Sequence, residues 1–148
     1  MKIFIDADGC PVVDLTLETA EKYQVETVIL CDTSHEFRRD GIETVVVSKG
    51  ADSVDFALVN RIQSGDIAVT QDYGLAAMCM AKGAIPINQN GMIYTDANID
   101  ALLLARHTAK KIRNAGGRLK GNGKRTPQQN ADFVKVLDSL IGTLLSKN

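Results

Sequence analysis

Acidic side chains stand at the ends of two β-branched segments of this 148-residue chain. Asp6 and Asp8 lie two residues apart at the end of residues 2–8, and Asp72 follows residues 67–70. Residues two apart in extended backbone point to the same side. If the two segments are neighbouring strands of a parallel sheet, we expect their acids to meet in one cleft at its carboxyl edge.

A second pair of acids, Asp52 and Asp55, is three residues apart at the start of a predicted helix, on one face of its first turn. Carboxylates gathered this closely raise one another's pKa unless a cation neutralises them. Oxygen ligands without His or Cys nearby favour Mg²⁺ or Mn²⁺ over Zn²⁺. We therefore expect one cleft to hold such a metal through these acids: Asp6, Asp8, Asp52, Asp55 and Asp72.

These acids also have structural interpretations. Asp52 suits the N-cap of the helix that it precedes, with Asp55 in the first turn, and both would favour the helix dipole. Asp72 could likewise cap a helix that begins at Tyr73. Asp6 and Asp8 are harder to explain in this way, because a carboxylate on a buried central strand is costly without a partner and no Lys or Arg lies nearby in the sequence.

The elements that must position these residues alternate between strand and helix. Strands are predicted at residues 2–8, 26–32, 43–48, 67–70 and 84–88. Helices are predicted from Pro11, from Asp52, over 73–82, over 96–114 and from Thr126. This order predicts an α/β fold, a mainly parallel sheet flanked by helices and followed by two C-terminal helices. We expect one domain, with an α/β body over 1–95 and a basic helical part over 96–148.

The last predicted helix carries its own start signal. Thr126-Pro127-Gln128-Gln129 is a capping box with proline at the first helical position. Its apolar face consists of Phe133, Val136, Leu137, Leu140, Ile141 and Leu144. This face needs a partner, and the α/β body is the simplest one.

The net charge of −1 conceals an uneven distribution. Residues 1–105 carry 7 basic and 16 acidic side chains, whereas residues 106–148 carry 10 basic and 2 acidic ones. Eight Lys or Arg residues and no carboxylate lie between positions 106 and 125. The near-neutral net charge excludes a uniformly basic nucleic-acid binder. The uneven distribution of charge is nevertheless compatible with a nucleic-acid site confined to the basic segment.

This basic segment, residues 106–125, is predicted to contact a nucleic-acid backbone, with an affinity that depends on salt and little on sequence. The alternative is a solvated helix face followed by a loop. Arg106 lies on or near the apolar face of its helix, so it is either a buried ion-pair partner of an active-site carboxylate or a clamp on the substrate. The candidate nucleic-acid contacts are Arg106, Lys110, Arg113, Arg118, Lys120, Lys124 and Arg125.

The amino-acid composition excludes several further classes of protein. Seven aromatic residues and no Trp argue against a base-stacking platform. Three widely separated Cys suit reduced thiols in a cytoplasmic protein. No apolar run approaches the roughly 20 residues that span a bilayer, so no membrane association is expected. Met1 leads directly into a strand, and no signal peptide is visible.

Four stretches of the chain resemble the uncharacterised bacterial YaiI/YqxD family. They are IDADGCP, KGADSVDFALVN, GDIAVTQDYGLAAMCMAKGA and LLLAR…IRNAGG. The resemblance covers nearly the whole chain. That family is grouped with PIN-like domains, and the resemblance implies a parallel α/β sheet with an acidic metal cluster and a Mg²⁺- or Mn²⁺-dependent nuclease, with RNA as the favoured substrate.

The resemblance matches the family's first-strand acid to Asp6, its mid-chain acids to Asp52 or Asp55, and its last acid to Asp72. Asp8 belongs to the DAD signature of this family. Two positions depart from the pattern, Gly9 where the family often has Ala, and Asn122-Gly123 in place of Gly-Pro.

The reaction expected from these residues is metal-assisted phosphodiester hydrolysis. Asp6 and Asp72 are the expected catalytic residues and first metal ligands, and Asp8 is the next. Asp52 and Asp55 would hold a second metal or orient water. Ser48 and Thr70 are candidate hydrogen-bond donors behind the ligands.

Two other functions fit parts of the sequence. A phosphatase of the haloacid dehalogenase type also has two acids at the end of a hydrophobic strand, but Cys10 stands where it usually has Thr or Val and no acid pair follows a late strand. A non-catalytic nucleic-acid or partner-binding module on a PIN-like scaffold would use the basic segment without needing Asp6.

Overall fold

The structure, a computed structural model, describes residues 1–34, 37–50, 52–116 and 123–147. Its strands pair in the order β3-β2-β1-β4-β5, and every pair is parallel. They are β1 (Lys2–Asp6), β2 (Glu26–Asp32), β3 (Glu43–Val47), β4 (Ile67–Val69) and β5 (Ile85–Ile87). The predicted α/β fold is confirmed, and β1 and β4 are neighbours.

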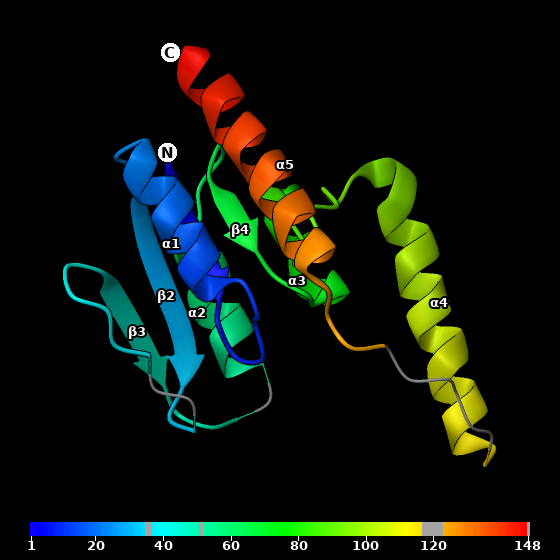
Figure 1. The fold of residues 1–148 in the computed structure, drawn as a ribbon. Coiled ribbons are helices and arrows are strands. Elements are labelled where there is room, and N and C mark those ends of the chain that lie inside the picture. The colour runs from blue at the N-terminus through cyan, green and yellow to red at the C-terminus, as the bar shows by residue number, and fades with distance from the viewer. Residues whose placement is uncertain (35–36, 51, 117–122, 148) are drawn as a thin grey trace.

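Helices cover both faces of this sheet (Figure 1). α1 (Val13–Lys22) and α5 (Pro127–Ser146) pack on one face, and α2 (Ser53–Arg61) and α3 (Tyr73–Ala81) pack on the other. α4 (Asp96–Asn114) contacts α3. No helix in these described ranges is long and apolar enough to cross a membrane.

Alternation along the strands builds the two layers of the core. Ile3 and Ile5 of β1 are fully buried with residues of α1 and α5, whereas Phe4 between them packs with residues of α2 and α3. This period of two is what a strand covered on both faces requires. The sheet is therefore held rigidly at its centre, where β1 ends in Asp6.

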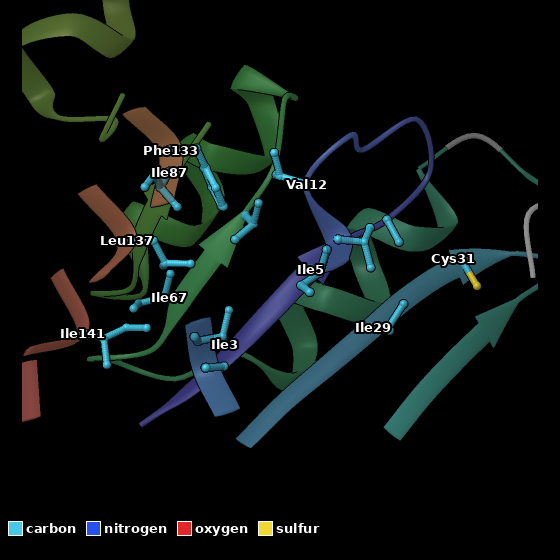
Figure 2. Close-up of a cluster of buried hydrophobic side chains, with 14 residues drawn as sticks. Ile3, Ile5, Val12, Ile29, Cys31, Ile67, Ile87, Phe133, Leu137 and Ile141 are labelled. Atoms are coloured by element: carbon cyan, nitrogen blue, oxygen red, sulfur yellow. The ribbon is translucent and has the colours of Figure 1, made fainter. Parts of the chain in front are cut away.

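The apolar face of α5 completes the first of these layers. Phe133, Leu137 and Ile141 are fully buried, and Figure 2 shows them against Ile67 and Ile87. The predicted capping box is present, since the Thr126 hydroxyl accepts from the Gln129 backbone N–H and the Gln129 side chain accepts from that of Thr126. The expectation that α5 packs on the α/β body is confirmed.

The start of the first helix differs from the prediction. α1 begins at Val13, whereas we expected a helix from Pro11. The Cys10 N–H donates to the Ala7 carbonyl at 3.0 Å, and Gly9 has φ of +72°, so residues 7–10 form a turn. Pro11 suits this turn as well as a helix, because its fixed φ is compatible with both.

Candidate active site

A cleft of about 690 Å³ opens at the carboxyl edge of the sheet. All five acids predicted to bind metal line it, together with Arg106 and one further carboxylate. The acids come from the ends of β1 and β2 and from the starts of α2 and α3. The charged residues of the lining are Asp6, Asp8, Asp32, Asp52, Asp55, Asp72 and Arg106.

The strand order explains why a cleft forms at this place. The connection from β1 leads to β2 on one side, whereas β4 pairs with the other side of β1. Connections diverge at such a reversal and leave a crevice outside the carboxyl ends of the strands. In the β1–β4 register Ile5 faces Val69, so the residues that follow, Asp6 and Thr70, are brought side by side.

Thr70 connects the acids of β1 and α3. Its hydroxyl donates to Asp6 Oδ2 at 2.8 Å and accepts from the Asp72 backbone N–H at 3.0 Å. The Tyr94 hydroxyl donates to the Thr70 carbonyl at 3.2 Å, and Thr70 is only 1% exposed. Thr70 therefore fixes one oxygen of Asp6 relative to the start of α3.

Asp72 is both an N-cap and part of the cleft. Its Oδ1 accepts from the backbone N–H groups of Gly74 at 2.8 Å and Leu75 at 3.1 Å, which confirms the capping interpretation. The same oxygen lies 3.6 Å from Nη1 of Arg106. The ion pair expected between Arg106 and a cleft carboxylate is therefore present, but the expectation that it is buried is wrong, because the Arg106 side chain is 59% exposed.

Asp52 occupies the N-cap position of α2, but its side chain makes no capping hydrogen bond. Its backbone is left-handed, with φ of +64°. The expectation that Asp52 is the N-cap of α2 is therefore confirmed in position but not in its side-chain hydrogen bond, and its backbone differs from the extended conformation typical of N-cap residues. Non-glycine residues held in this region are uncommon and gather at functional sites.

The turn after β1 brings Asp8 beside Asp32, a cleft residue that was not predicted from the sequence. β1 ends at Asp6, and Asp8 Oδ2 accepts from the Asp32 backbone N–H at 3.1 Å. Asp32 is the last residue of β2 and lines the cleft. The same signal that marked Asp6, an acid at the end of a β-branched run, could have identified Asp32.

Burial and like charges act together on Asp6. Burial is the largest cause that raises the pKa of Asp6 to about 6, and the carboxylates of Asp72 and Asp8 raise it further. The hydrogen bond from Thr70 opposes the shift. Asp6 is therefore an acid whose ionised form the cleft disfavours.

The pKa of Asp55 is raised to about 6 as well, chiefly by burial and then by neighbouring acids. Asp72, Asp6 and Asp52 contribute in that order, whereas Arg106 lowers it. The acids at the start of α2 and at the end of β1 thus influence one another electrostatically. Perturbed carboxylates in a cleft are typical of functional sites.

These acids do not form a preformed metal shell. Within the described residues, no three carboxylate, His or Cys side chains are arranged to hold a metal ion. The cleft therefore combines the ligand chemistry expected for a hard cation with side chains that are not yet in a coordinating arrangement.

The remaining predicted residues lie in several places. Ser48 is exposed after β3 and is not among the residues that line the cleft. Lys110 and Lys124 are exposed. Arg113 belongs to α4, but its side chain is outside the described part of the structure, as are Arg118 and Lys120.

Arg125 makes three hydrogen bonds within the protein. Its guanidinium donates to Asn130 Oδ1 and Asn90 Oδ1 at 2.7 Å each, and to the Gln89 carbonyl at 2.6 Å. These bonds tie the start of α5 to the turn that follows β5. The predicted contact of Arg125 with nucleic acid stays a prediction, and its position in the fold has a structural explanation.

An all-parallel sheet with helices on both faces and a cleft at its topological switch point places the chain in the class of open α/β proteins. Within that class, the chain belongs to the family described as "Uncharacterized BCR, YaiI/YqxD family", whose sequence profile matches residues 4–143. The resemblance to this family is thus confirmed.

Several bacterial relatives are similar over almost their whole length, and each is called a UPF0178 protein. The one from Exiguobacterium sibiricum is 52% identical over 95% of this chain and 96% of its own. That of Ruminiclostridium cellulolyticum is 52% identical over 93% and 90%. That of Clostridium acetobutylicum is 43% identical over 95% and 97%. No solved structure matches the chain at a significant level.

Proposed function

We propose that this protein is a divalent-metal-dependent nuclease of the PIN-like type that hydrolyses phosphodiester bonds, with RNA as the favoured substrate. The observation that carries the proposal is the convergence of acids from two strand ends and two helix starts on one cleft beside Arg106. The preference for RNA rests on the resemblance to PIN-like domains, which often act on RNA.

The chemistry of the cleft fits Mg²⁺ or Mn²⁺. Its ligand atoms are carboxylate oxygens. Burial first, and then neighbouring carboxylates, raise the pKa of Asp6 and of Asp55, and a bound cation would favour the ionised form of both groups. Since the side chains are not arranged for coordination, binding requires some of them to rotate. Asp6 and Asp72 are the proposed first ligands, because Thr70 links them, and Asp8 is the next.

A bound cation would polarise the phosphoryl oxygen and lower the pKa of bound water. The residues of the chain have complementary tasks. Thr70 orients Asp6 through its hydroxyl, and Asp52 and Asp55 would hold a second cation or orient water. Arg106, which lines the cleft, would contact the phosphate, and Lys110 would extend that contact along α4.

The test is cleavage of a labelled single-stranded RNA in Mn²⁺ and in EDTA. We expect cleavage only with Mn²⁺, and a loss of about 100-fold or more in Asp6→Asn and Asp72→Asn. Asn keeps the shape of Asp and can still cap α3, so the fold is retained. Asp14→Asn is the matched control, because Asp14 is an exposed residue of α1 that lies outside the cleft, where it forms an ion pair with Arg39.

The non-catalytic alternative is favoured by one observation, the absence of a preformed metal arrangement among the described residues. Under that alternative RNA binds equally well with Mn²⁺ and with EDTA, and Asp6→Asn changes nothing. Uncut RNA and DNA at saturating Mn²⁺, or unchanged cleavage in both Asn variants, would contradict the nuclease. Beryllium fluoride bound at Asp6 would instead indicate the phosphatase.

A further inference from the structure

Among the described residues, one side of α4 packs on the body of the protein and the other does not. Ile99 is buried, and Leu102 and Leu103 pack with it against residues of α3. From Leu104 onward nearly every described side chain of α4 is exposed. Figure 1 shows α4 at the side of the molecule, with its C-terminal half extending beyond the other helices and strands.

The outward side of α4 is apolar. Its residues recur at spacings of three and four, which places them on one face of the helix, opposite Arg106. Leu104 is 65% exposed and Ile112 38%, and small side chains lie between them. Single exposed apolar residues are ordinary, whereas a continuous apolar face indicates a binding partner. This outer face of α4 consists of Ala97, Ala101, Leu104, Ala105, Thr108 and Ile112, all exposed.

We propose that the outer face of α4 binds the same face of a second copy of this chain, with the two helices antiparallel. Charge complementarity selects this partner and this direction. Asp100 and Lys111 lie along one edge of the face, eleven residues or about three helical turns apart. With a two-fold axis midway between them, Asp100 of each copy faces the partner's Lys111, whereas parallel pairing would place this edge of one helix against the opposite edge of the other and leave both charges without this partner.

The size of the face is consistent with a reversible dimer. The 19 residues of α4 form a rod of about 28 Å. Alanine at three of the six positions allows the two backbones to approach to about 8 Å, so that Leu104 and Ile112 become buried. A specific interface is expected to bury about 1,000 Å² or more in total, so the pairing must use most of the length of α4.

The two sides of α4 thus have different tasks. The inner side carries Arg106 to the cleft, and the outer side joins two copies of the chain. The pairing would restrain the helix that holds Arg106 beside Asp72, although it does not depend on the nuclease activity proposed above.

Sedimentation equilibrium of the full chain at 1–200 µM tests this proposal. We expect a reversible dimer of the 16.0-kDa chain. Leu104→Glu should raise the dimer dissociation constant about tenfold or more, because it places a charge in the contact while Glu preserves helix propensity. Phe56→Glu is the matched control, since Phe56 is 60% exposed on α2 and should leave the dimer unchanged.

A charge exchange tests the direction of pairing. Asp100→Lys and Lys111→Asp should each weaken the dimer, and the double variant should restore it, because only antiparallel pairing brings these two positions together. A monomer throughout the concentration range, a dimer unaffected by Leu104→Glu, or a double variant weaker than both single variants would overturn the proposal.

Discussion

The two ends of the sheet surround a carboxylate with opposite environments. At the amino end, Asp66 is 7% exposed, and its two oxygens accept from the backbone N–H groups of Lys2 and Gln63 at 2.9 Å each. At the carboxyl end, Asp6 accepts from the hydroxyl of Thr70, and neighbouring carboxylates add to the effect of burial on its pKa.

This difference separates a structural acid from a candidate functional one. Backbone donors satisfy Asp66 within the fold, so its charge stabilises the turn before β4. The charge of Asp6 is disfavoured by its surroundings, an arrangement that costs stability and is retained where it serves binding or chemistry. Substitutions at the two ends should therefore have effects of opposite sign on the free energy of unfolding.

The largest effect is expected at the amino end. Asp66→Ala should lower the free energy of unfolding by about 2–3 kcal/mol, because it leaves the N–H groups of Lys2 and Gln63 without their acceptor. Urea unfolding monitored by circular dichroism measures this quantity. A loss below about 1 kcal/mol would mean that the two ends differ less than the hydrogen bonds indicate.

At the carboxyl end, Asp6→Asn should stabilise the metal-free protein by about 1–2 kcal/mol at pH 7.5. The folded pKa of Asp6, about 6, exceeds the ordinary 3.8, so the folded protein retains a proton between these values that the unfolded chain has released. The contribution of protonated Asp6 to the free energy of unfolding is therefore fully present below pH 4 and is lost as the pH rises through 6. Unfolding in EDTA at pH 7.5 and pH 4 measures the difference, which should vanish at pH 4; equal effects at both pH values would contradict it.

A divalent cation should stabilise the protein through the acids at the carboxyl end of the sheet and not through Asp66 at the amino end. We expect Mn²⁺ at about ten times its dissociation constant to raise the Tm by about 3–5 °C, since it binds only the folded protein. Asp6→Asn should abolish most of this shift and Asp14→Asn none of it. Differential scanning fluorimetry provides the measurement, and an equal shift in all three proteins would indicate binding elsewhere.

The smallest effect is expected from Arg106→Gln. The ion pair with Asp72 is largely exposed, so stability should change by less than about 0.5 kcal/mol. The pKa of Asp55 should nevertheless rise, because Arg106 lowers it in the native protein. Carboxyl chemical shifts followed by NMR during a pH titration would show this, and an unchanged or lower pKa would place Arg106 outside the electrostatics of the cleft.

Much of the fold was predictable because its signals are local. The β-branched run of β2 predicts its bounds at Glu26 and Asp32, and the capping box predicts the start of α5 at Pro127. The convergence of the acids on one cleft followed from alternation of strand and helix, provided that β1 and β4 were neighbours, which they are.

Other features depend on contacts that local sequence does not contain. The left-handed backbone of Asp52 is one such feature, since Asp was expected there as an ordinary cap with extended backbone. Pro11 is compatible with a turn and with a helix, so the local sequence does not decide that α1 begins at Val13, after the turn closed by the Ala7–Cys10 hydrogen bond. The periodicity of α4 indicates an apolar face, but it does not reveal that the protein itself leaves Leu104 exposed.

The pairing of β1 with β4 has a consequence for the order of events during synthesis. The hydrogen bond from Thr70 to Asp6 joins residues 64 positions apart. A nascent chain that ends before β4 therefore contains Asp6 but lacks the strand that completes the cleft beside it. Domains synthesised from the N-terminus acquire such long-range contacts late. The acids become neighbours only when about half of the chain has been made, which confines the proposed chemistry to molecules that have nearly completed their sheet.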